Sequence, residues 1–126
     1  MRKRLAGVGL ALALCFGSVT PVLAADPAAM TDISGHWAEQ TIRWSMEQGL
    51  FNGTDGTSFT PDGVMTRAMF VSVLARMEGI NEEEYKTPYL PTLYNDVDST
   101  EYFAPALNWA TRYGIVNGMG DGGFHP

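Results

Sequence analysis

The feature that most constrains the fold is an internal repeat. A constant spacing of 65 residues pairs Trp44 with Trp109. The other matching blocks are Asp32-Ile33 with Asp96-Val97, at a spacing of 64, and then Gly49 with Gly114, Asn52-Gly53 with Asn117-Gly118, Phe59 with Phe124 and Pro61 with Pro126. This pattern indicates two copies of one supersecondary unit, the second of which stops at its midpoint. Units of this size cannot bury an apolar face alone, so we expect them to pack against neighbours.

The first copy begins with a predicted helix and a turn-rich loop. Ser34 can cap a helix over 34–49, and the small or apolar residues that recur on one face are Ala38, Ile42, Ser45 and Gly49, the last of which is a natural stop. The loop that follows is dense in residues that favour turns, and Phe59 is its apolar anchor. Asn52-Gly53 and Asn117-Gly118 need an adaptable backbone, so turn formation is their first expected role.

A second helix is predicted after this loop. Thr66 can cap it, and it runs from Arg67 to about Met77 before Gly79 ends it. Its predicted buried stripe is Phe70, Val71, Leu74 and Met77. In the second copy, Pro105 is expected in the first helical turn, where its missing amide hydrogen costs little. The sequence therefore predicts a mainly α fold of helix-loop-helix units.

The chain divides into five predicted segments. They are a secretory signal peptide (1–24), a spacer (25–30), the first repeat (31–79), a linker that holds Pro88 and Pro91 (80–94) and a truncated second repeat (95–126). The signal peptide is indicated by the basic Met1-Arg2-Lys3-Arg4, by an apolar run too short to span a membrane and by cleavage after Ala24 or Ala25. Cys15 lies within it, so the exported chain would lack disulfides and thiolate metal sites. We expect a secreted protein with no membrane partner once the signal is cleaved.

Composition and motifs argue against several classes of function. The formal charge is −6, with 14 Asp plus Glu against 8 Lys plus Arg, which disfavours nucleic acid as a partner. His36 and His125 are far apart in the sequence and no nucleophile motif accompanies them, so we expect no enzyme activity. The glycines from Gly118 to Gly123 match a dinucleotide fingerprint but lack the strand and helix that it requires. The acid-rich turn around Asp55 lacks the ligand ladder of a calcium loop, so no metal or cofactor is expected.

Five ordered blocks of the first copy carry a family resemblance. They are Asp32-Ile33, His36-Trp37-Ala38, Gly49-Leu50-Phe51-Asn52-Gly53, Phe59-Thr60-Pro61-Asp62 and Met65-Thr66-Arg67-Ala68, and most recur in the second copy. Together they resemble the S-layer homology (SLH) domain of bacterial surface proteins. The resemblance implies helical repeats, commonly three around a pseudo-threefold axis, with ligand grooves between adjacent repeats; about one and a half are present here. It also implies non-covalent attachment, at the cell wall or S-layer surface, to secondary cell-wall polysaccharide or another peptidoglycan-linked glycan, often carrying pyruvate ketals.

A glycan site is predicted around Arg67. The predicted ligand-binding residues are Arg67, Trp37, Thr66, Asn52, Gly53, Tyr102, Asn117 and Gly118. A guanidinium at the first turn of a helix, with nearby free amides, can converge on the carboxylate of a pyruvyl ketal. Met69 replaces the glutamate of the family's motif, which removes the reciprocal half of a capping box. The alternative for Arg67 is a solvated cation that opposes the helix dipole.

Other residues have structural alternatives, and the function has competing interpretations. Trp37 can stack on a sugar or belong to the core. Trp44 and Trp109 are expected to pack between repeats, and Asp32 and Asp96 to cap or brace the helices that follow them. The alternatives to wall anchoring are a structural or protein-interaction module of the cell envelope, or the anchoring fragment of a longer surface enzyme. Further SLH repeats or a second copy of the chain are candidate partners.

Overall fold

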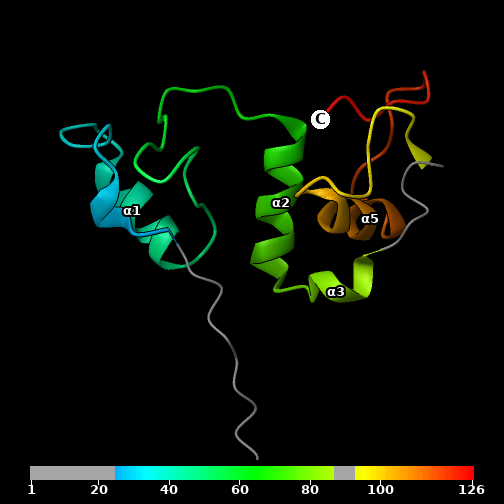
Figure 1. Cartoon of the computed structure of the whole chain (residues 1–126), viewed down its shortest axis with the longest axis horizontal. Helices are drawn as coiled ribbons and strands as arrows, with labels where there is room; N and C mark the ends of the chain where they lie inside the picture. The colour runs from blue at the N-terminus through cyan, green and yellow to red at the C-terminus, as the bar shows by residue number, and fades with distance from the viewer. Residues whose placement is uncertain (1–24, 87–92) are drawn as a thin grey trace, which may run out of the picture.

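The computed structural model describes residues 25–86 and 93–126, in which helices are joined by turns and loops (Figure 1). In chain order the elements are η1 (Pro27–Ala29), α1 (Glu39–Glu47), α2 (Arg67–Glu78), α3 (Glu82–Tyr85) and α5 (Ala104–Arg112), and these residues contain no strand. The predicted mainly α fold is confirmed. None of the described helices is long and apolar enough to cross a membrane. The predicted signal peptide, Pro88 and Pro91 fall outside the described residues.

Helix α1 begins later than the sequence predicts. Ala38 occupies its N-cap position and makes no side-chain capping bond, so the prediction that Ser34 caps this helix is wrong. The segment before Ala38 forms turns instead. The Glu39 carboxylate accepts a hydrogen bond from the Gly35 N–H at 2.8 Å. An acidic side chain in the first turn therefore holds the backbone that precedes the helix, in place of a serine cap.

Helix α2 starts and ends where the sequence predicts, but it buries a different face. Thr66 Oγ1 accepts a hydrogen bond from the Met69 N–H at 3.2 Å, and Gly79 follows the helix in the left-handed region with φ of 63°. Phe70 and Met77 are 51% and 64% exposed, so the predicted buried stripe is wrong at these positions. The buried side chains are Ala68, Val71, Ser72 and Ala75. Small side chains on this face allow a neighbouring helix to approach closely.

The neighbour of α2 is α5, which belongs to the other repeat. Figure 1 shows α2 beside α5 and α3, with α1 on the far side. The larger hydrophobic core joins α2 to the second repeat and includes Val71, Ala75, Tyr94, Leu107, Trp109 and Phe124. The smaller core lies in the first repeat and contains Met30, Ile33, Ile42 and Met46. The second helix of the first repeat therefore completes the core of the second repeat.

The two repeats differ in how far their first helices are covered. Trp109 on α5 is 7% exposed, whereas its counterpart Trp44 on α1 is 55% exposed. The prediction that both tryptophans pack between the repeats is thus confirmed for Trp109 and wrong for Trp44. The reason is that α2 and α3 both pack against α5, while α1 packs against the short η1. Pro105 lies in the first turn of α5, as predicted.

Candidate functional site

Each repeat builds the same turn around the aspartate at its start. The carboxylate of Asp32 accepts hydrogen bonds from the N–H groups of Phe59 and Thr60, at 2.9 and 2.7 Å. Asp96 makes the equivalent pair of bonds in the second repeat, both at 2.8 Å. These backbone hydrogen bonds lower the pKa of both carboxyl groups. The aspartates are structural, as expected, but they brace the distant loop rather than the helix that follows, because the loop folds back beside the start of its repeat.

A glycine in each turn sits where two backbone segments come close. Gly53 has φ of 78°, and a Cβ there would lie 2.7 Å from the Ser58 carbonyl oxygen. A Cβ on Gly118 would lie 2.9 Å from the Gly123 carbonyl oxygen. Any other residue would clash at both positions, so the predicted turn-forming role of these glycines is confirmed.

Arg67, in the first turn of α2, reaches across to the turn of the second repeat. Its Nη1 donates to the Phe124 carbonyl oxygen at 2.6 Å and its Nη2 to the Asn117 carbonyl oxygen at 2.7 Å. The guanidinium carbon lies 4.3 Å from the centre of the Phe124 ring. Charge-assisted hydrogen bonds and a cation–π contact therefore act together. The interpretation of Arg67 as a solvated cation is wrong, since two of its N–H groups bind protein carbonyls.

A groove of about 560 Å³ lies between the first-repeat turn, α2 and the start of the second repeat. Three of the predicted site residues line it, namely Asn52, Gly53 and Tyr102. Arg76 also lines it and donates from Nη1 to the Leu50 carbonyl oxygen at 2.9 Å. Sequence reasoning missed Arg76. The signal that points to it is its place in the last turn of α2, in a chain with few cations.

The groove carries a local positive charge in an acidic chain. Arg76 is the one charged side chain among the described residues that line it, and none of them is a carboxylate. Much of the remaining lining is apolar and includes Phe51, Met65 and Met69. Low-dielectric surroundings strengthen the attraction between the guanidinium and a negative ligand group. Because Met69 stands where the family's motif has glutamate, position 69 adds no negative charge to the groove.

The other predicted site residues lie elsewhere. Thr66 and Trp37 are not among the residues that line the groove. Thr66 caps α2, and Trp37 is 90% exposed with its ring 5.5 Å from that of His36. The alternative that placed Trp37 in the core is therefore wrong. The structure gathers Asn52, Gly53 and Tyr102 at the groove, and it gathers Arg67, Asn117 and Gly118 at the second-repeat turn.

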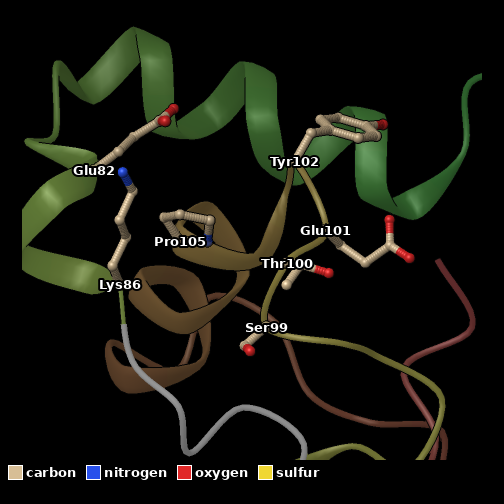
Figure 2. Close-up of a pocket in the computed structure, with 7 residues that line it drawn as sticks. All are labelled: Glu82, Lys86, Ser99, Thr100, Glu101, Tyr102 and Pro105. Carbon is tan, nitrogen blue, oxygen red and sulfur yellow. The ribbon is translucent and has the colours of Figure 1, made fainter.

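A second hollow, of about 500 Å³, lies between α3 and the segment that leads into α5 (Figure 2). Glu82 and Lys86 lie on one side of it, and Ser99, Thr100 and Glu101 lie on the other. Two carboxylates against one ammonium make this hollow less suited to an anion than the groove beside Arg76. Within residues 25–86 and 93–126, no group of three or more His, Cys, Asp or Glu side chains is placed to hold a metal ion.

Comparison with protein families identifies the class. The S-layer homology domain model matches residues 29–69 and 93–126, which is more than half of the chain. This protein belongs to the S-layer homology domain family. The family resemblance and the SLH repeats expected from the sequence are thereby confirmed. No solved structure gives a significant match.

Curated relatives include bacterial surface proteins and an enzyme. A surface layer protein of Brevibacillus choshinensis is 31% identical over 98% of this chain and 11% of its own length. A middle cell wall protein of Brevibacillus brevis is 32% identical over 98% of this chain and 12% of its own length. Endo-1,4-beta-xylanase A of Thermoanaerobacterium saccharolyticum is 30% identical over 71% of this chain and 7% of its own length. The chain thus spans a small part of each relative. As an SLH module related to S-layer proteins, it is of a class that implies association with the cell wall at the cell envelope.

Proposed function

We propose that this chain anchors non-covalently to the cell wall by binding secondary cell-wall polysaccharide in the groove between its two repeats. The observation that carries the proposal is the groove itself, where Arg76 is the one charged side chain among the described lining residues. Pyruvate ketals place carboxylates on sugar rings, and a planar guanidinium is well suited to bind them. Membership of the SLH family supports the same ligand class.

In this proposal, Tyr102 and the first-repeat turn recognise the sugar ring. Tyr102 is 63% exposed, so a face of its ring is open to a sugar. The hydroxyl oxygens of Thr54 and Thr60 lie 2.9 Å apart on the groove wall. Together with the Asn52 side chain they offer donors and acceptors to sugar hydroxyls. Arg76 gives one of its five N–H donors to the backbone, which fixes its position and leaves others for a carboxylate.

The remaining predicted residues belong, in this proposal, to equivalent junctions with further repeats. Asn117 and Gly118 are the second-repeat counterparts of Asn52 and Gly53. Arg67 holds their turn through the Asn117 carbonyl oxygen, and Thr66 fixes the helix end that presents Arg67. Trp37 is the counterpart of Tyr102 and is exposed. Two such half-sites therefore flank the complete groove.

Co-sedimentation with purified cell-wall sacculi tests this function. Residues 25–126 should sediment with intact sacculi and remain in solution after the secondary polysaccharide is stripped. Tyr102→Ala and Arg76→Gln should weaken binding by about tenfold each, which is the loss of one good contact. Tyr113→Ala is the matched control, because Tyr113 is 61% exposed and lies outside the groove. Equal sedimentation with stripped sacculi by a chain that circular dichroism shows to be folded would contradict the proposal.

Two related roles complete the proposal. We propose that the predicted signal peptide exports the chain, and that the chain is the binding part of a surface protein rather than a catalyst. The match to a short part of a xylanase fits an anchoring segment. A protein-interaction role is the second candidate, and the half-exposed Trp44 favours it. A folded chain that ignores sacculi would support that second role.

A further inference from the structure

Methionine side chains form part of the wall of the groove between the repeats. Met65 and Met69 both line it, and Met65 is 46% exposed while Met69 is partly buried. Neither residue belongs to the two hydrophobic cores of the described residues. The Thr66 hydroxyl binds the backbone N–H of Met69 and makes no use of its side chain. Both thioethers can therefore change chemically without disturbing the packing that holds the fold.

The other methionines of residues 25–126 fall into two groups. Met30 and Met46 are buried in the smaller core. Met77 and Met119 are each 64% exposed, but neither is among the residues that line the groove. A small oxidant in solution attacks exposed thioethers in preference to buried ones. The chain thus has accessible methionines both inside and outside the groove, which allows their effects to be separated.

Met69 stands where this chain departs from the family's motif, which has glutamate at that position. A thioether is oxidised by peroxides, whereas a carboxylate is not. Met69 also shares the groove-facing side of α2 with Ser72, Val73 and Arg76, which follow it at helical spacing. A change of polarity at Met69 therefore acts on the same helix face that carries the guanidinium of the groove.

We propose that Met65 and Met69 form a reversible oxidation site, and that their conversion to methionine sulfoxide by a peroxide weakens ligand binding in the groove. The thioether sulfur attacks one oxygen of hydrogen peroxide, the O–O bond breaks and a sulfur–oxygen bond forms. The departing oxygen takes up the proton of the transferred oxygen and leaves as water. The sulfur loses two electrons and the peroxide gains them. This inference rests on the proposed function, because it concerns the ligand of the same groove.

Oxidation changes the groove in two ways that both disfavour an anionic sugar. The sulfoxide is polar, so this part of the wall holds water and less apolar area is buried when a ligand binds. The sulfoxide oxygen also carries partial negative charge, which repels a carboxylate that approaches Arg76. The buried Met30 and Met46 stay reduced, so the fold is retained. Methionine sulfoxide reductases, one for each sulfoxide epimer, reverse the change.

Peroxide treatment followed by co-sedimentation tests the proposal. Residues 25–126 are treated with hydrogen peroxide until peptide mass spectrometry shows complete oxidation at positions 65 and 69, and circular dichroism verifies that helicity is kept. The oxidised chain should bind intact sacculi about tenfold more weakly than the untreated chain, which is the loss of one good contact. Treatment with both classes of methionine sulfoxide reductase should restore binding.

Two pairs of substitutions assign the effect to the groove. Met65→Leu with Met69→Leu removes both sulfur atoms at similar apolar volume. This variant should bind sacculi like the untreated chain and should keep its binding after peroxide treatment. Met77→Leu with Met119→Leu is the matched control, because these methionines are exposed outside the groove. The control should lose binding on oxidation as the unsubstituted chain does.

The outcomes separate this inference from the function on which it rests. If the untreated, folded chain fails to sediment with sacculi, the proposed function is overturned and the oxidation site with it. If the untreated chain sediments and the fully oxidised chain sediments equally well, only the oxidation site is overturned. Loss of binding after peroxide treatment of the Met65→Leu, Met69→Leu variant also overturns it, as does loss of helicity on oxidation, because other residues would then cause the effect.

Discussion

At the scale of single residues, the aspartates that open the two repeats act as acceptors for a turn that lies far along the chain. Hydrogen bonds from Phe59 and Thr60 lower the pKa of Asp32, and equivalent bonds lower the pKa of Asp96. A carboxyl group with a lowered pKa in the folded chain stabilises the fold above its unfolded pKa, about 3.9. That stabilisation is lost as the pH falls through the folded pKa. Acid should therefore loosen both turns.

A pH series of thermal unfolding checks this expectation. We expect the Tm to be steady above about pH 5 and to fall increasingly below about pH 4, as these carboxylates take up protons. Asp32→Asn with Asp96→Asn should lower the Tm at pH 7 and flatten its fall between pH 5 and pH 3. Glu47→Gln, at an exposed position on α1, is the control. An unchanged acid response in the double variant would contradict the role given to the two aspartates.

Gly53 offers a second test at this scale. Its φ of 78° disfavours any residue with a Cβ, and that Cβ would meet the Ser58 carbonyl oxygen at 2.7 Å. Gly53→Ala should therefore lower the free energy of unfolding by roughly 1–3 kcal/mol. Gly56→Ala is the matched control, since a Cβ there has nothing within 4 Å. Urea unfolding followed by circular dichroism measures the free energy of unfolding of both variants. Equal stability of the two variants would argue against the close approach of Gly53 to the Ser58 carbonyl oxygen.

The residues that form the turns could be predicted from the sequence, whereas their partners could not. Asn52-Gly53 is a local signal for a turn. The partner of the Phe59 amide is Asp32, 27 residues away, and no local pattern specifies that pairing. The turn could therefore be located from the sequence, but Asp32 was expected to cap or brace the helix that follows it and not the turn.

At the scale of elements, α2 shows the same division between local and distant causes. Its ends depend on Thr66 and Gly79, which act on the adjacent backbone, and both could be predicted. Its buried face depends on α5, which belongs to the other repeat. Phe70 and Met77 are the largest apolar residues at helical spacing, but the close helix contact selects the small Ala68 and Ala75 instead. Apolar periodicity alone cannot reveal which face meets a neighbour.

Enlarging one residue of this face should therefore destabilise the protein. Ala75 is 1% exposed and packs in the core shared with α5. Ala75→Leu should lower the free energy of unfolding by about 1–3 kcal/mol, because the added methyl groups have no space. Met77→Leu, at a position that is 64% exposed, should change it by less than about 0.5 kcal/mol. Chemical denaturation of both variants tests which face of α2 is buried. A greater loss of free energy of unfolding from Met77→Leu than from Ala75→Leu would favour the buried stripe predicted from the sequence.

At the scale of the whole molecule, two arginines hold one helix between two repeats and leave a groove beside it. Three of the residues that line the groove could be predicted as ligand-binding residues, because they lie in the repeated blocks. They are Asn52, Gly53 and Tyr102. Arg76 could not be predicted, because its role depends on where α2 packs. Arg67 was predicted as a glycan-binding residue. Its contact with Phe124 could not be predicted, because it arises from the placement of the second repeat against the first.

The position of Arg67 predicts that one substitution affects both stability and wall binding. Arg67→Ala removes two charge-assisted hydrogen bonds and a cation–π contact between the repeats. We expect the free energy of unfolding to fall by about 2–3 kcal/mol, with helicity retained at pH 7 and less protein bound to sacculi. Arg112→Ala, at an exposed position of α5, is the control. Urea unfolding and co-sedimentation are measured on the same preparations. If Arg67 only contacted the glycan, Arg67→Ala would lose wall binding while the free energy of unfolding stayed unchanged. If Arg67 only joined the repeats, wall binding by the variant would be restored by a disulfide that reconnects α2 to the second-repeat turn.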